Sequence, residues 1–255
     1  MSTYDAVAQT FDRHRALPDG AVQAIRNAVL AAVAAPRPRL LDLGAGTGRI
    51  GWPFVAAGDD YVGVDVSFGM LRAFRKRIGR PNGLALVQSD GQLLPFADAA
   101  FDGVLLVQVF GGLRGWRRLM AEARRVLTPA GTLIVGRTLA PEDGVDARMK
   151  HHLALLLDEM RVAPGVNARD EVQRWLDATA TAATCVIAAT WDAERTPRGF
   201  LERHRTGARF STLPDPIRAD ALGKLATWAT GTFGSLDAAH CEPHRFELRT
   251  FKFTT

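Results

Sequence analysis

The sequence predicts an α/β fold, with a seven-stranded mixed sheet that is parallel except for its last strand and has helices on both faces. Three observations lead to this fold. An apolar strand runs into a glycine-rich turn and a helix at residues 40–50. Two further β-rich runs, at residues 61–65 and 84–90, each end in an acid. Helical segments and short apolar runs then continue along the rest of the 255-residue chain.

The chain begins with a helical leader over residues 3–35. One helix is expected at residues 4–15, and a second, which Asp19 can cap, runs through Ala34. Tyr4, Phe11 and His14 are separated by seven and three residues, so they share one face of the first helix.

The glycine-rich turn predicts a ligand site. Glycine occupies alternate positions at Gly44, Gly46 and Gly48. Each removes a Cβ that would keep the backbone away from a ligand, and each permits positive φ. The N–H groups at the start of the next helix face the same crevice. Because Arg49 stands where a dinucleotide-binding fingerprint needs its third glycine, the spacing argues against a nicotinamide cofactor.

The next two strands also end in acids. Asp65 closes the run at residues 61–65 and can accept hydrogen bonds from ribose hydroxyls. It can equally lie at the start of the helix at residues 68–80, which Ser67 could cap, and both interpretations can hold together. The third strand is followed by Asp90 and Gly91.

The remaining elements follow from apolar periodicity and from breakers. Strands are expected at residues 102–108, 132–135, 184–191 and 246–253. Helices are expected at residues 116–127, 145–160, 167–178, 196–208 and 216–230. Residues 128–131, Thr-Pro-Ala-Gly, are expected to break the chain before the fifth strand.

Four motifs in order, within residues 40–135, resemble the class I S-adenosylmethionine-dependent methyltransferases, in particular their type 11-like, small-molecule branch. The glycine turn, with Asp42 before it, resembles motif I. Residues 67–71 match the pattern Ser-x-x-Met-Leu, and residues 90–102 match D-x-x-x-L-P-F-x-D-x-x-F-D. Residues 122–131 resemble E-x-x-R-V-L-x-P-G-G, although Ala130 replaces the first glycine. The resemblance implies a Rossmann-like fold.

The resemblance implies S-adenosyl-L-methionine as the cofactor. Asp65 would bind the ribose and Asp90 the adenine amino group, while the N–H of Gly91 would meet the ring. Met70 would lie against the adenine, or be an ordinary core residue. Gln108 would reach the methionine part of the cofactor, a looser match to the family. The full expected set is Tyr4, Phe11, Asp42, Gly44, Ala45, Gly46, Thr47, Gly48, Asp65, Val66, Met70, Ser89, Asp90, Gly91 and Gln108.

The expected organisation is a single methyltransferase domain over residues 1–255. Within it we expect an N-terminal helical lid at 1–36 and a cofactor-binding core at 37–140. Helical substrate-cap insertions are expected at 141–180 and 196–233, and closing strands at 184–191 and 244–254. The insertions would enclose a pocket for a small, partly apolar acceptor.

The expected reaction moves a methyl group to an O, N, S or C nucleophile of a small molecule. The alternatives are a non-catalytic S-adenosylmethionine-binding protein and an RNA-directed methyltransferase. If the acceptor must lose a proton, His14 is the candidate base. Tyr4 and Phe11 on the same face could stack against the sulfonium or simply dock the helix. His151 and His152 are adjacent and lack metal-ligand spacing, so no metal is expected.

The composition of the chain limits the partners and the cellular location that we expect. The net charge of +5 comes mainly from arginines on helices that also carry apolar residues, which is typical of solvated faces and argues against a nucleic-acid partner. The chain has neither 18 consecutive apolar residues nor a signal-peptide pattern, so we expect no membrane span. Two cysteines suit a reducing cytoplasm. The expected state is a monomer or homodimer.

Overall fold

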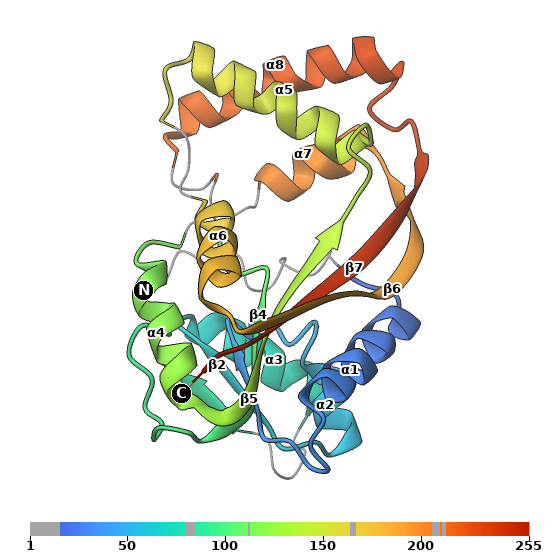
Figure 1. Ribbon diagram of the computed structural model, residues 1–255. Coiled ribbons are helices and arrows are strands. Elements are labelled where there is room, and N and C mark those ends of the chain that lie inside the picture. The colour runs from blue at the N-terminus through green and yellow to red at the C-terminus, as the bar shows by residue number, and fades with distance from the viewer. Residues whose placement is uncertain are drawn as a thin grey trace.

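The computed structural model describes residues 16–79, 85–111, 113–163, 167–205, 210 and 213–254. Seven strands form one sheet in the order β3-β2-β1-β4-β5-β7-β6 (Figure 1). Their bounds are β1 Leu40–Leu43, β2 Tyr61–Asp65, β3 Ala85–Gln88, β4 Phe101–Val107, β5 Leu127–Leu139, β6 Ala182–Arg195 and β7 His240–Lys252. β1 to β5 pair in parallel, and β7 runs antiparallel to both β5 and β6. The predicted sheet, including its antiparallel last strand, is confirmed.

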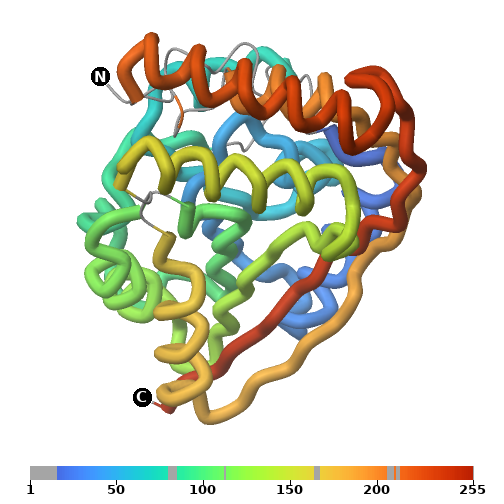
Figure 2. Tube along the Cα trace, turned by 90° about the horizontal axis from the view of Figure 1, so that it is seen from above, coloured from blue at the N-terminus to red at the C-terminus, as the bar shows by residue number. Residues whose placement is uncertain are grey.

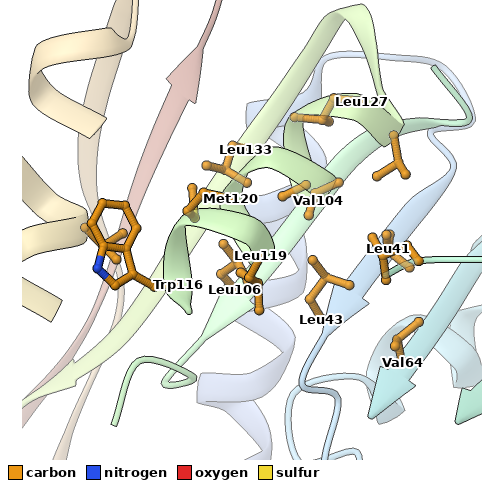
Figure 3. Packing of buried hydrophobic residues seen from close by; sticks show 14 of the residues in the cluster. Leu41, Leu43, Val64, Val104, Leu106, Trp116, Leu119, Met120, Leu127 and Leu133 are labelled. Atoms are coloured by element: carbon orange, nitrogen blue, oxygen red, sulfur yellow. The ribbon is translucent and has the colours of Figure 1, made fainter. Parts of the chain in front are cut away.

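Helices cover both faces of the sheet because successive strand residues point to opposite sides. On one face Leu40 and Leu105 pack with α1 (Asp19–Val33), α2 (Trp52–Ala57) and Phe74 of α3 (Phe68–Ile78). On the other, Leu41 and Leu106 pack with α4 (Trp116–Val126) and α6 (Arg169–Thr179). Figure 3 shows Leu119 and Met120 of α4 lying over this second face.

The cap is formed by three helices with a hydrophobic core of their own. α5 (Val145–Glu159), α7 (Pro197–Arg205) and α8 (Asp215–Phe233) bury Met149, Phe200 and Leu225 among one another. α5 and α8 run side by side (Figures 1 and 2), and Figure 1 shows them beyond one end of the sheet. The cap therefore faces the strand ends that the sequence marks with acids.

Two parts of the expected organisation need correction. Residues 19–33 are not a lid, because Ile25, Val29 and Val33 are buried against the sheet. The second half of the 141–180 insertion is not part of the cap, because Val172 and Leu176 of α6 pack into the sheet core. An amphipathic pattern shows that a helix buries one face but does not say what covers it.

Two local expectations also change. Asp19 does not cap α1: the helix begins at that residue, with Pro18 before it and no side-chain cap. The expected break at residues 128–131 lies within β5, where the register against β4 shifts between Phe101 and Gly103. The expected Ser67 cap of α3 is confirmed, since its hydroxyl accepts a hydrogen bond from the N–H of Met70 at 3.2 Å. None of the helices in the described ranges is long and apolar enough to cross a membrane.

Candidate cofactor and acceptor site

A cavity of about 950 Å³ lies at the carboxyl ends of β1, β2 and β4, with walls from both the core and the cap. Ligands of open α/β sheets bind outside these strand ends, and the volume is typical of a small-molecule site. Twelve of the expected cofactor residues line it: Asp42, Gly44, Ala45, Gly46, Thr47, Asp65, Val66, Met70, Ser89, Asp90, Gly91 and Gln108. Gly48 does not line it, and Tyr4, Phe11 and His14 lie outside the described residues.

The three glycines of the turn all have positive φ but meet different surroundings. A Cβ on Gly44 would lie 2.4 Å from Val109 Cγ1, and one on Gly48 would lie 2.0 Å from the Phe74 ring. At Gly46 the nearest atom would be a backbone oxygen 3.8 Å away. Gly46 alone therefore has open space where its side chain would be. The other two glycines make room for protein side chains.

Asp65 is oriented by two backbone donors. Its Oδ2 accepts a hydrogen bond from the N–H of Gly46 at 2.9 Å, and its Oδ1 accepts one from the N–H of Ser67 at 2.8 Å. Because Ser67 also caps α3, the carboxylate joins the glycine turn to the start of that helix. Met70 lies one turn further on, is buried, and still borders the cavity. Asp65 thus presents a fixed acceptor at the cavity wall.

Asp42 is buried beneath the turn. The Tyr61 hydroxyl, from the neighbouring strand, donates to Asp42 Oδ2 at 2.6 Å. Burial raises the pKa of Asp42 to about 6, although the hydrogen bond from Tyr61 opposes the rise. The acid before the glycine turn is therefore part of a buried pair and also borders the cavity.

The loop after β3 is held by α4. Asp90 Oδ1 accepts a hydrogen bond from the N–H of Gln92 at 2.9 Å, which fixes the start of the loop. Further on, Glu122 accepts from the N–H of Leu94 at 2.7 Å, and Arg125 donates to the carbonyl of Phe96 at 2.8 Å. The Arg125 guanidinium lowers the pKa of Glu122 to about 2. Two sequence motifs that lie apart in the chain therefore contact each other.

Gln108 follows β4 with a φ of 56°, which is uncommon for a residue other than glycine. Its Oε1 accepts from Arg49 Nη2 at 2.6 Å, and its Nε2 donates to Thr138 Oγ1 at 3.1 Å. These bonds hold a strained backbone at the cavity wall, a position where strain often has a functional role. Phe110, two residues further along the chain, is buried in the sheet core.

The sequence predicted that cap helices enclose a pocket, but it did not identify the residues of the cap wall. From α5 this wall comprises Lys150, Leu153, Ala154, Leu157 and Asp158, which share one helix face. From α7 and the segment after it come Arg203, His204, Phe210 and Leu213. Helical spacing could have grouped the α5 residues. No pattern in the sequence says that this face meets the cavity.

His204 is the histidine that lines the described cavity. Its ring stacks on Phe200, with centroids 3.8 Å apart, and its Nδ1 lies 3.0 Å from the carbonyl oxygen of Phe200. A carbonyl oxygen can only accept, so Nδ1 carries the proton and Nε2 is the basic atom of the neutral ring. Among the described residues, no group of three or more His, Cys, Asp or Glu could hold a metal ion.

Comparison with known proteins finds a methyltransferase-like region. Residues 41–135 match the family model described as a methyltransferase domain. A demethylmenaquinone methyltransferase of Renibacterium salmoninarum is 36% identical over 143 residues, which are 55% of this chain and 59% of that protein. Residues 41–135 of the chain thus form a region similar to a methyltransferase domain. The chain spans less than two thirds of the length of the curated relatives it matches.

Solved structures share the fold of this chain. A putative type II methyltransferase from Anaeromyxobacter dehalogenans has a TM-score of 0.60 and 18% identity, over 91% of this chain and 96% of the other. The 4+2 cyclase SpnF has a TM-score of 0.57 and 17% identity, over 100% of this chain and 98% of the other. At these identities the likeness shows the fold alone.

Proposed function

We propose that this chain binds S-adenosyl-L-methionine in the cavity and transfers its methyl group to an O, N, S or C nucleophile of a small molecule. The observation that carries the proposal is the hydrogen bond from the Gly46 N–H to Asp65 Oδ2, at 2.9 Å. It joins a glycine with open space on its side-chain side to an oriented acceptor at the same cavity wall. That combination suits a nucleoside whose ribose meets an acid while its substituents pass over exposed backbone.

Each residue of the core wall would bind a different part of the cofactor. Asp65 would accept hydrogen bonds from the ribose hydroxyls. Asp90 would accept from the adenine amino group, and Met70 would pack on the ring. The glycine turn and Gln108 would hold the methionine part. Ala45, Thr47, Val66, Ser89 and Gly91 would complete the contacts.

When bound, the cofactor supplies a methyl carbon already activated by its sulfonium. The chain's contribution is then alignment, because an in-line displacement gains much of its acceleration from the position of the acceptor. Leu153 and Leu157 of the cap provide an apolar surface opposite the core wall. A small, partly apolar acceptor fits between these walls.

An acceptor that must lose a proton needs a base, and two residues are candidates. We propose His204, because it borders the cavity and Nε2 is the basic atom of its neutral ring. His14, proposed from the sequence, lies outside the described residues. A nucleophile that arrives already deprotonated would need neither.

The reaction can be tested by label transfer. Purified protein is incubated with methyl-tritiated cofactor and a cell extract, and the extract is then separated into small-molecule, RNA and protein fractions. We expect enzyme-dependent label in the small-molecule fraction. Label in RNA would instead support the RNA-directed alternative. Cofactor binding without any label transfer would support a non-catalytic binding protein.

The remaining expectations on the whole protein stay proposals. We propose a cytoplasmic enzyme that acts as a monomer or homodimer without a nucleic-acid partner. Its cysteine content and its small-molecule cavity support this interpretation.

A further inference from the structure

One face of α5 forms a continuous stretch of the cap wall. Lys150, Leu153, Ala154, Leu157 and Asp158 are spaced as neighbours on one side of a helix, and all of them border the cavity. Phe210 and Leu213 add to the apolar part of this wall. Lys150 is thus a cation at one end of an apolar strip. Asp158 lies eight residues further on, about 12 Å along the helix axis.

Charged residues border the cavity on both walls. The core wall carries Asp42, Asp65 and Asp90, and each accepts a hydrogen bond from the protein. The cap wall carries the cations Lys150 and Arg203. The core wall also carries Arg49 and Arg114, and the cap wall also carries Asp158, so charges of both signs border both halves of the cavity.

Lys150 and Arg203, the cations of the cap wall, differ in their partners among the described residues. Its natural helix partner four residues earlier is Asp146. That carboxylate is already shared, because Arg203 hydrogen bonds to Asp146 Oδ1 and Arg195 Nε lies 3.6 Å from its Oδ2. Across the described ranges Lys150 makes no ion pair with any other residue. The exposed Lys150 ammonium at the end of the apolar strip is therefore available to an external anion.

We infer that the methyl acceptor carries an anionic group, such as a carboxylate, which binds Lys150 while an apolar body packs on Leu153 and Leu157. The inference rests on the proposed function, whose acceptor it describes. A charge-assisted hydrogen bond is stronger than one between neutral groups. Lys150 lies beyond the matched residues 41–135, so the inference concerns this chain's own cap.

A pair of fluorescent probes tests the inference without knowledge of the natural acceptor. 1-Anilinonaphthalene-8-sulfonate and N-phenyl-1-naphthylamine share one apolar body, and only the first carries an anion. Each is titrated into wild-type protein, Lys150→Gln, Lys150→Arg and Lys224→Gln. Lys224 is a matched control, because it lies on cap helix α8 and pairs with Asp220 at 2.9 Å.

We expect Lys150→Gln to weaken binding of the sulfonate probe about tenfold and to leave the neutral probe unchanged. Lys150→Arg should restore the sulfonate affinity, and Lys224→Gln should match the wild type. The inference is overturned if Lys150→Gln binds both probes as the wild type does, or if it loses both equally. Neither probe titration contains the cofactor, so its outcome does not depend on cofactor binding. The proposed function would instead be refuted if S-adenosylhomocysteine did not bind.

Discussion

The Tyr61 hydroxyl donates a 2.6 Å hydrogen bond to Asp42 Oδ2, and the two side chains come from neighbouring parallel strands beneath the glycine turn. Both residues are almost completely buried. Burial raises the pKa of Asp42 to about 6 from its ordinary value of 3.8. The free energy of unfolding therefore depends on pH through the ionisation of Asp42.

The sign of this linkage follows from the raised pKa. Between about pH 4 and pH 6 the folded protein holds a proton on Asp42 that the unfolded chain has released, so stability falls as the pH rises through this interval. Over this interval the free energy of unfolding falls by on the order of 3 kcal/mol. We expect Asp42→Asn to remove this part of the pH dependence, as measured by urea unfolding from pH 4 to pH 8. Equal slopes in both proteins would contradict it.

The glycine turn yields a second prediction, because its glycines differ in what a methyl group would meet. Gly48→Ala combines a positive φ with overlap with Phe74, so we expect a loss on the order of 3 kcal/mol. Gly46→Ala has the positive φ without the overlap and should cost about 1–2 kcal/mol. It should also weaken S-adenosylhomocysteine binding, because its methyl group enters the space proposed for the ligand.

Gly58→Ala is the control for this pair, since Gly58 has a φ of 78° with nothing within 4 Å of the added Cβ and does not border the cavity. It should show the φ cost alone, with unchanged ligand affinity. Urea unfolding and calorimetric titration measure the two effects. Equal affinity of Gly46→Ala and Gly58→Ala for S-adenosylhomocysteine would contradict the proposed position of the ligand at Gly46.

The candidate bases can be separated kinetically once label transfer has identified an acceptor. If His204 takes the proton, His204→Gln should lower turnover about 10²–10⁴-fold with little change in cofactor affinity. His14→Gln should then retain turnover, and the exposed His151 provides a control substitution on the cap. The reverse result, in which only His14→Gln loses turnover, would move the base to the leader segment.

Much of the core half of the site could be predicted because its signals are local. Asp65 and Asp90 follow apolar runs, and parallel strands bring their carboxyl ends to one edge. The roles of Gly44 and Gly48 could not be predicted in the same way. They depend on Val109 and Phe74, which are distant in the sequence and reach the turn only through the fold.

The sequence predicted a helical cap over the acceptor, but it could not identify the cap residues that line the cavity. Lys150 and His204 lie on helices whose spacing indicates a buried face, but not whether that face meets a sheet, another helix or a cavity. The same ambiguity made residues 19–33 look like part of a lid, although they pack on the sheet. Local patterns thus predict the elements better than their partners.

Asp65 provides the most direct test of the central claim, that this cavity binds an adenosyl cofactor. S-adenosylhomocysteine is titrated calorimetrically into wild-type protein, Asp65→Asn and Asp60→Asn. Asp60 is a matched control, because it is an exposed acid just before β2, at the end of the strand opposite Asp65. Circular dichroism checks that each variant is folded.

We predict one binding site in the wild type, with the same affinity in Asp60→Asn. In Asp65→Asn the affinity should fall about 10–100-fold, because the charge-assisted hydrogen bonds to the ribose are worth about 1.5–3 kcal/mol. No binding to the wild type, or equal affinity in the wild type and folded Asp65→Asn, would contradict the claim.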